Sequence, residues 1–590
     1  MNILLIQPPL RDFYRTRLRT QPLGLAYLAA SLRHHGHSPR ILDCQTDAKR
    51  HVPVPEELGY LQEHYVPGDQ SPFRLYGRFY RFGMSPDDIR EGIITKRPDA
   101  VGLQCQFTPY VNDALEVAAL VKSVDRHIPV IAGGAHASCQ PERLLADKNV
   151  DFVIIGEGEQ SLPRLIDCLG KGGGLENIQG LASRHGGSVH IRPRTSFIDK
   201  LDLLPLPARD LLDLDVYTIG GRRSTMLITS RGCPQGCTYC SVAALMGARL
   251  RTRSIESVLD EIRTCVTQHD IRVFDIEDDN FTWDRQRALQ ILEALRDEYG
   301  GAGIGLTAMN GLSLLSLDHG LLEALRRAGF LHLDLALGSA APRKNAQLGR
   351  KEHSPATDSV LEKAAGRGFA VTTYILLGVP GHSLEDMLAS IQYLASRPTM
   401  IGPSIFYPSP GTRLYDELAT KELRLPGREI LLRSSAFSVE TTDFCRLDII
   451  TLLRYVRWIN FIKRLLHDED RSSCTLADIR NEAAAWWPEQ VPYATECPPA
   501  GLLFSTETPL VPAGAGRIAS AFQFAHDRFH AIRRVRTPDR GVYTYRVLPC
   551  ATSARVMHAI NGLTDNGAGI TAARVKPVGQ GSRTITHVYH

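Results

Sequence analysis

Three cysteines lie close together in the stretch RGCPQGCTYCS, at Cys233, Cys237 and Cys240. Thiolates bind zinc and iron–sulfur clusters, and closely spaced cysteines in one loop can reach a single metal centre. Structural zinc sites pair one C-x2-C unit with a second pair or with histidines, and the sequence has no second such pair. The spacing therefore favours a four-iron cluster over zinc. The iron without a cysteine is then free to be chelated by a molecule that carries an amine and a carboxylate.

The segment around this loop predicts a partial parallel barrel of the TIM type over residues 221–430. The loop follows the strand-like stretch STMLITS at 224–230, and further apolar strands alternate with helical segments up to IGPSIFYPSPGT at 401–412. Barrels of this kind carry their chemistry on loops at the carboxyl ends of the strands. The cysteine loop occupies that position after the first strand.

A second series of strands and helices covers residues 1–170. Apolar strands separated by amphipathic helices predict a doubly wound, Rossmann-like sheet, whose ligands bind beyond the carboxyl ends of the strands. Residues 50–85 interrupt the series with aromatic residues and arginines, which is typical of a lid or a binding loop. Residues 171–220 are predicted to be a linker, because GKGGG at 170–174 and a proline-rich stretch at 201–210 mark this segment. Residues 431–590 are predicted to be a mainly helical or mixed extension that closes the barrel and shapes a substrate pocket.

Composition sets further limits on the function. The chain has 590 residues, a formal net charge of +4 and no uninterrupted apolar segment as long as the roughly 18–20 residues that span a bilayer. The small charge gives no electrostatic argument for nucleic acid as a partner. The amino-terminal stretch lacks the features of a signal peptide, so we expect a cytoplasmic protein whose thiols stay reduced.

The cysteine spacing, with Tyr239 directly before the last cysteine, resembles the radical S-adenosylmethionine (SAM) superfamily. The resemblance implies that the three cysteines hold a 4Fe–4S cluster. It also implies that SAM chelates the fourth iron through its amino and carboxylate groups. Electron transfer then cleaves SAM to a 5′-deoxyadenosyl radical, which requires an external electron donor of the flavodoxin or ferredoxin type.

Other stretches are similar to the SAM contacts of that superfamily. EDDNF at 277–281 stands where the family places the acceptor of the SAM amino group, and ILLGVPG at 375–381 resembles the strand and turn beside the adenine. A helix N-cap cluster and a buried strand with its turn are the alternative explanations. Gly338 departs from the family, which often has a glutamate there. The residues implied to bind SAM are Tyr239, Asp278, Asp279, Asn280, Ser339 and Gly378.

The first domain resembles the cobalamin-binding subgroup of radical SAM enzymes, through QPLGLAYLAA at 21–30, GGAHAS at 133–138 and DFVIIGEGE at 151–159. The resemblance implies that the nucleotide tail of cobalamin lies between the sheet and a helix. The implied contacts are Gln104, Gly133, Gly134, His136, Glu157 and Arg74. A hydrogen-bonded turn histidine and a surface arginine are the alternatives for His136 and Arg74. The Asp-x-His-x-x-Gly motif is absent, which implies no histidine ligand on the lower face of cobalt.

The resemblance implies methyl transfer from methylcobalamin to an unactivated carbon or a phosphinate of a small-molecule or natural-product substrate. No protein side chain is predicted to act as the catalytic nucleophile. Ring closure or rearrangement without methyl transfer is an alternative. A methylthiotransferase would need a second cluster, for which Cys44, Cys105 and Cys139 are candidates, although buried thiols explain them as well. A non-catalytic cobalamin sensor or carrier remains a further alternative.

Overall fold

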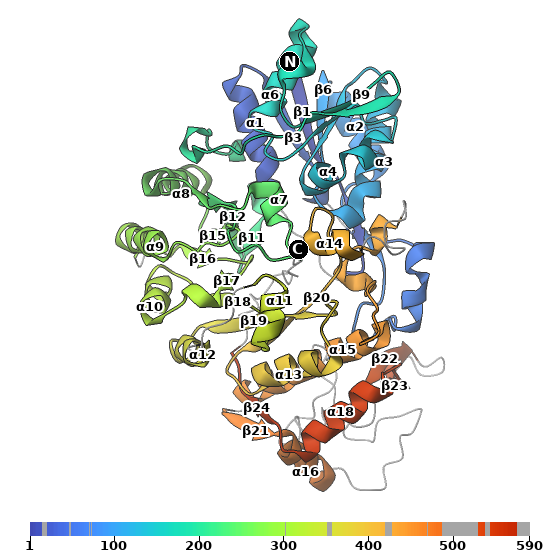
Figure 1. Cartoon of the computed structure of the whole chain (residues 1–590), viewed down its shortest axis with the longest axis vertical. Helices are drawn as coiled ribbons and strands as arrows, with labels where there is room; N and C mark the ends of the chain where they lie inside the picture. The colour runs from blue at the N-terminus through green and yellow to red at the C-terminus, as the bar shows by residue number, and fades with distance from the viewer. Residues whose placement is uncertain are drawn as a thin grey trace.

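The computed structural model describes most of the chain and arranges it along one long axis (Figure 1). The described residues are 1–14, 21–46, 49–69, 71, 73–300, 303–350, 357–418, 428–468, 470–486, 529–536 and 543–574. The amino-terminal sheet lies at one end of the view, the barrel in the middle, and the carboxyl-terminal elements at the other end.

The first domain is built on a seven-stranded sheet in the order β10-β9-β8-β7-β6-β1-β3. Its parallel strands are β1 (Asn2–Gln7), β3 (Ser38–Asp43), β6 (Ala100–Gln104), β7 (Val130–Gly133) and β8 (Phe152–Ile154). The chain runs from β1 outward to β3 and then returns to β6 on the other side, so the strand order reverses between β1 and β6. This is the doubly wound topology that the sequence predicts, and ligands of such sheets bind at the reversal.

Helices cover both faces of this sheet. One face packs against α1 (Leu23–His34) and α6 (Ser161–Lys171), and the other packs against α2 (Pro86–Lys96) and α3 (Val111–Val124). The antiparallel strands β9 (Leu181–His185) and β10 (Ser188–Ile191) extend the sheet beyond β8. The sheet therefore continues into the segment that the sequence predicts to be a linker.

The insertion at residues 50–85 forms a small layer against the rest of the molecule. Its strands β4 (Lys49–His51) and β5 (Tyr80–Phe82) pair with β2 (Leu10–Asp12) in the order β2-β5-β4, and the short helix η2 (Glu56–Glu63) lies between them in the chain. Phe73 and Phe79 are buried in the same hydrophobic core as the barrel and the long helix α15. The aromatic residues of the insertion therefore join the two domains.

The barrel is partial and consists of two parallel sheets, in agreement with the predicted fold class. The first contains β12 (Arg222–Leu227), β15 (Val273–Ile276) and β16 (Gly305–Thr307), with β11 (Thr218–Ile219) antiparallel at its edge. The second contains β17 (Leu312–Ser313), β18 (His332–Gly338), β19 (Ala370–Leu377) and β20 (Met400–Ile405). Helices α8 (Ile255–His269), α9 (Arg285–Tyr299), α10 (His319–Arg327), α12 (Thr357–Gly366) and α13 (Leu384–Ala395) follow the strands. Their buried faces pack against the outward side chains of the strands, such as Phe274 and Ile276.

The carboxyl-terminal extension begins with α15 (Arg446–Asp468), which is buried along most of its length and packs on β20 and α13. It continues with β21 (Ser473–Thr475), α16 (Leu476–Trp486), β22 (His530–Arg536), β23 (Tyr543–Pro549), α18 (Ala554–Asp565) and β24 (Gly569–Thr571). The strand-like stretch TITHVYH at 584–590 lies outside the described residues. Among the described residues, no helix has both the length and the apolar character needed to cross a membrane.

Candidate cofactor sites and barrel interior

A cavity opens at the carboxyl ends of β1, β6, β7 and β8, where the strand order reverses. It contains about 910 Å³ of empty space, including its open mouth, which suits a large organic ligand. Its walls come from the sheet, α1 and the loop after β8, and Ile228, Arg231 and Met246 of the barrel complete it. The cavity therefore lies between the first domain and the cysteine loop.

Glycines shape the walls of this cavity. A Cβ at Gly102 would lie 2.6 Å from Leu5 Cδ2, and a Cβ at Gly134 would lie 2.7 Å from the carbonyl oxygen of Cys105. Gly134 also has φ +117°, a conformation that side chains disfavour. A Cβ at Gly133 would instead meet only the Ile154 carbonyl, at 3.9 Å. The backbone at Gly133 therefore faces open space in the cavity. A wall without side chains at this point fits the close approach of the nucleotide tail of cobalamin.

The predicted cobalamin contacts separate into two groups. Gln104, Gly133, Gly134 and Glu157 line the cavity, whereas His136 and Arg74 do not. His136 is buried with its Nδ1 3.1 Å from Thr108 Oγ1, and burial lowers its pKa to about 4. The main-chain carbonyl of Arg74 accepts a hydrogen bond from the Arg457 side chain.

The three cysteines lie half-buried in a tightly held loop between β13 (Ser230–Arg231) and α7 (Val242–Met246). Gly232 makes the turn with φ +87°, and a Cβ there would lie 2.3 Å from the Arg249 carbonyl oxygen. The Cys233 N–H donates to the Gly247 carbonyl at 3.2 Å. These contacts bring the two ends of the loop together.

Within the described residues, no three His, Cys, Asp or Glu side chains converge on a site for a single metal ion. A cluster differs from a single ion because each cysteine binds a different iron. The donors available in this loop are the three thiols of Cys233, Cys237 and Cys240. This donor set fits a 4Fe–4S cluster with one iron left for SAM.

The acidic run after β15 holds the cysteine loop in place. Both oxygens of Asp278 accept hydrogen bonds from Thr229, and Oδ2 also accepts one from Ser230 Oγ at 2.6 Å. Asp279 Oδ2 accepts a hydrogen bond from the Gly232 N–H at 2.7 Å, and burial raises the pKa of Asp279 to about 6. Asn280 Nδ2 lies 3.9 Å from Cys233 Sγ. Its buried Oδ1 has no hydrogen-bond partner among the described residues, so it remains available to a ligand.

Of the remaining predicted SAM contacts, Tyr239 belongs to the cysteine loop, and Ser339 and Gly378 come from the second half of the barrel. The Tyr239 hydroxyl accepts a hydrogen bond from Arg350 Nη1 at 3.2 Å. Ser339 is buried, and its Oγ accepts a hydrogen bond from the Ala341 N–H at 3.1 Å. The Gly378 N–H points at Met387 Sδ, 3.2 Å away. The structure therefore brings the acidic run to the cysteine loop, which contains Tyr239. Ser339 and Gly378 instead shape the loops after β18 and β19.

Arg350 is a residue of this site that sequence reasoning missed. Its Nη2 donates to the Ala336 carbonyl at 2.6 Å, so the guanidinium bridges β18 and the cysteine loop. A Cβ at Gly338 would lie 2.8 Å from Asn345 Oδ1 and 3.1 Å from Arg350 Cδ, and Gly338 has φ +80°. A side chain at this position, where the family often has a glutamate, would therefore meet both Asn345 and Arg350.

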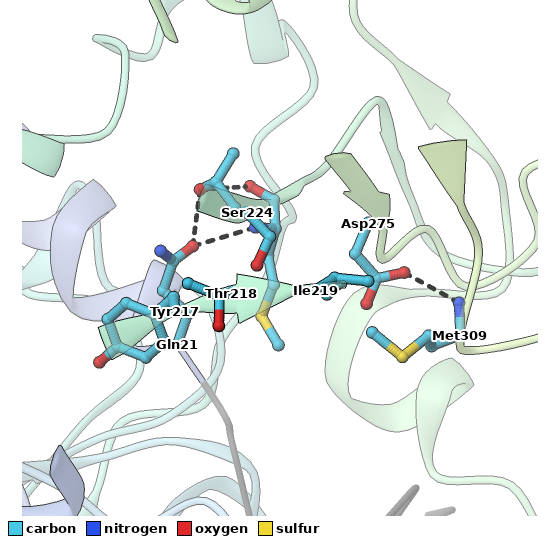
Figure 2. Close-up of a pocket in the computed structure, with 9 residues that line it drawn as sticks. Gln21, Tyr217, Thr218, Ile219, Ser224, Asp275 and Met309 are labelled. Carbon is cyan, nitrogen blue, oxygen red and sulfur yellow. Dashed lines mark hydrogen bonds between the residues drawn. The ribbon is translucent and has the colours of Figure 1, made fainter. Parts of the chain in front are cut away.

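A second pocket lies beside β11, β12 and β15 next to the connector, with about 370 Å³ of empty space. Figure 2 shows Gln21 of the first domain, Tyr217 to Ile219 of the connector and Asp275 of β15 around it. Asp275 Oδ1 accepts hydrogen bonds from Thr307 Oγ1 at 2.7 Å and from the Met309 N–H at 3.0 Å. Burial and the neighbouring Asp275 raise the pKa of Glu277 well above its usual range. This pair of carboxylates was also missed, although two acidic residues two positions apart in an apolar strand are visible in the sequence.

Comparisons with known proteins agree with a cofactor cavity in the first domain and a cysteine loop in the barrel. The family model "B12 binding domain" matches residues 77–166, and the model "Radical SAM superfamily" matches residues 227–394. The chain is 28% identical to an uncharacterized methyltransferase of Pyrococcus horikoshii, over 72% of this chain and 84% of that protein. It is also 28% identical to cytidylyl-2-hydroxyethylphosphonate methyltransferase of Streptomyces wedmorensis, over 69% and 79% of the two chains.

Solved structures share the fold. The radical SAM methyltransferase TsrM from Kitasatospora setae, with cobalamin and a 4Fe–4S cluster bound, matches with a TM-score of 0.56 at 17% identity and covers 71% of this chain and 78% of its own. A B12 binding domain followed by a radical SAM domain defines the class of protein. The chain contains both domains in this order, and these domains imply a 4Fe–4S cluster, SAM and cobalamin as its cofactors.

Proposed function

We propose that the protein transfers a methyl group from SAM through cobalamin to a carbon or phosphinate centre of a small organic substrate. The observation that carries this proposal is the position of the cobalamin cavity. Its wall contains Arg231, two residues before the first cysteine of the cluster loop, so the two cofactor sites face a common space. The methyltransferase names of the relatives support the same reaction.

When bound, the cluster supplies the electron that cleaves SAM, and cobalamin carries the methyl group between donor and acceptor. The chain itself positions these groups and excludes water. Asp278 and Asp279 hold the cluster loop, and Arg350 ties it to β18. Asn280 Oδ1, which is buried and has no hydrogen-bond partner in the described part of the chain, is available as an acceptor. The barrel pocket beside Asp275 is where we expect the substrate to enter, and an external one-electron donor is required.

The test uses the full chain, reconstituted anaerobically with iron, sulfide and cobalamin and supplied with SAM and a low-potential reductant. Methyl transfer to cobalamin predicts S-adenosylhomocysteine without added substrate, up to one equivalent per bound cobalamin. With SAM carrying a deuterated methyl group, products from a metabolite extract would gain the label. The absence of S-adenosylhomocysteine from protein that holds both cofactors would contradict the proposal.

Ring closure is the second candidate, because the chain is also 25% identical to the anaerobic magnesium-protoporphyrin IX monomethyl ester cyclase of Rubrivivax gelatinosus, over 57% of this chain and 61% of that protein. A cyclase would release 5′-deoxyadenosine without S-adenosylhomocysteine. Quantifying both nucleosides in the same reaction separates the two functions.

A further inference from the structure

The base of the cluster loop is closed by a short antiparallel ladder. β13 (Ser230–Arg231) pairs with β14 (Arg251–Thr252), so Arg231 and Arg251 lie opposite each other where the loop begins and ends. The Arg251 side chain also donates to the Met246 carbonyl at 2.7 Å, inside the loop. The orientation of the loop therefore depends on what holds these two arginines.

Both arginines are held by one carboxylate of the first domain. Glu157 Oε1 accepts hydrogen bonds from Arg231 at 2.9 Å and from Arg251 at 2.8 Å. Glu157 Oε2 accepts one from the Ile198 N–H at 2.9 Å, and Arg194 pairs with the same oxygen. Arg231 also pairs with Glu159, which lies with Glu157 in the loop after β8, at 2.7 Å.

This ion-pair group is almost completely buried and lies at the wall of the cavity. The side chains of Glu157, Arg251 and Arg231 are 1%, 2% and 7% exposed. Buried charges are costly without partners. Removing Glu157 would take the paired carboxylate from Arg251 and Arg194 and leave Arg231 with Glu159 alone. The pKa of Glu157 is held below its ordinary value although burial opposes this, because Arg231, the Ile198 N–H and Arg251 stabilise the carboxylate. Glu157 is therefore ionised and paired in the folded protein.

We propose that Glu157 is a positioning residue that fixes the cluster loop relative to the cobalamin cavity. Glu157 and Glu159 follow β8 at the cavity, and Arg231 and Arg251 start and end the cluster loop, so the ion pairs connect the two cofactor sites directly. A fixed orientation keeps the separation of the two cofactors constant. The inference concerns that separation and does not depend on which group is finally transferred.

The test compares Glu157→Gln with the wild type, each loaded with cluster and cobalamin. Both cofactors are paramagnetic after reduction to the one-electron-reduced cluster and cob(II)alamin, so pulsed electron paramagnetic resonance measures the distribution of distances between them. We expect a narrow distribution for the wild type. For Glu157→Gln we expect a broader or shifted one among the molecules that carry both cofactors.

Glu261→Gln is the matched control. Glu261 is equally buried, but it lies on α8, is not among the residues that line the cavity, and pairs with Arg209 and Arg253, which lie outside residues 231–251. The Glu261→Gln variant should destabilise the fold without changing the distribution of distances between the two cofactors. A wild-type distribution in Glu157→Gln, or the same broadening in both variants, would overturn the proposal.

A milder variant covers the case in which Glu157→Gln does not fold. Glu159→Gln removes one of the two carboxylates that bind Arg231 and leaves Arg251 paired with Glu157. The proposal predicts a broadening larger than that of Glu261→Gln. An unchanged distribution would overturn it. S-adenosylhomocysteine formation by the wild type, measured separately, reports on the proposed function and not on this inference.

Discussion

Two hydrogen bonds join Asp278 to Thr229 at the carboxyl ends of two adjacent barrel strands. The Thr229 N–H and hydroxyl donate to the two Asp278 oxygens at 2.6 and 2.5 Å. Thr229 follows β12 and immediately precedes β13, where the cluster loop begins, and Asp278 follows β15. The carboxylate thus positions the start of the loop that carries the cysteines.

Asp278→Asn should destabilise this connection. The carboxamide turns one acceptor into a donor, which faces a hydroxyl or N–H donor in a buried site, and such a mismatch costs about 1–3 kcal/mol. We expect this loss in the free energy of unfolding, together with fewer irons retained per chain. Asp284→Asn is the control, because Asp284 is an exposed N-cap of α9 and asparagine caps equally well. Equal unfolding of Asp278→Asn and wild type would contradict this role.

Cys237→Ala should remove the cluster and leave the cobalamin cavity intact. The variant lacks one of the three thiolates in the loop. The cavity is built from the first domain and a few barrel residues, and Cys237 is not one of them. Iron analysis and cluster absorbance measure the first effect, and cobalamin absorbance measures the second. Cys265→Ala is the control, since this buried thiol lies in α8; it should keep its iron. Iron retained by Cys237→Ala would contradict the assignment.

Gly133→Val should weaken cobalamin binding without unfolding the protein. The new side chain enters the cavity, where a Cβ meets only the Ile154 carbonyl at 3.9 Å. Overlap with the cofactor should raise the dissociation constant at least about tenfold, which corresponds to about 1.4 kcal/mol. Gly366→Val, on α12 with nothing within 4 Å of a Cβ, controls for the added side chain. An unchanged dissociation constant for Gly133→Val would place cobalamin elsewhere.

Glu277→Gln should become more stable than the wild type as the pH rises. Burial and Asp275 raise the pKa of Glu277, so above the ordinary pKa of glutamate the folded state binds more protons than the unfolded state. Wild-type stability then falls with rising pH by up to about 1.4 kcal/mol per unit from this group. The glutamine cannot titrate. Unfolding measured from pH 5 to pH 8 should show a growing difference, and parallel curves would contradict the raised pKa.

Lys463→Met should give the opposite pH dependence. Lys463 is fully buried on α15, and its Nζ donates to the carbonyls of Arg397 and Thr571 at 2.6 and 2.9 Å. Burial lowers its pKa to about 7, so between about pH 7 and pH 10 the unfolded state binds more protons. Wild-type stability should therefore rise with pH relative to Lys463→Met across this window. The two hydrogen bonds lost in the variant add only a constant offset.

The amino-acid sequence alone determined the order of the domains and indicated candidate residues for each site. Cysteine spacing, glycines at strand ends and the alternation of strands with helices are local properties, so they can be read without knowing the fold. The boundary of the first sheet was harder to predict. β9 and β10 lie in a glycine-rich and polar stretch, and only their pairing with the existing sheet makes them strands.

Only the tertiary structure decided which distant side chains meet at these sites. Arg350 reaches Tyr239 across 111 residues of sequence, and Glu157 reaches Arg231 across 74. Such pairs leave no periodic signal, because each depends on where two separate elements end in space. Asp278 is a second example. Its carboxylate suits an ammonium ligand, but in the structure its oxygens accept hydrogen bonds from Thr229 and Ser230. The side chain types thus define what chemistry is possible, and packing determines which partners they bind.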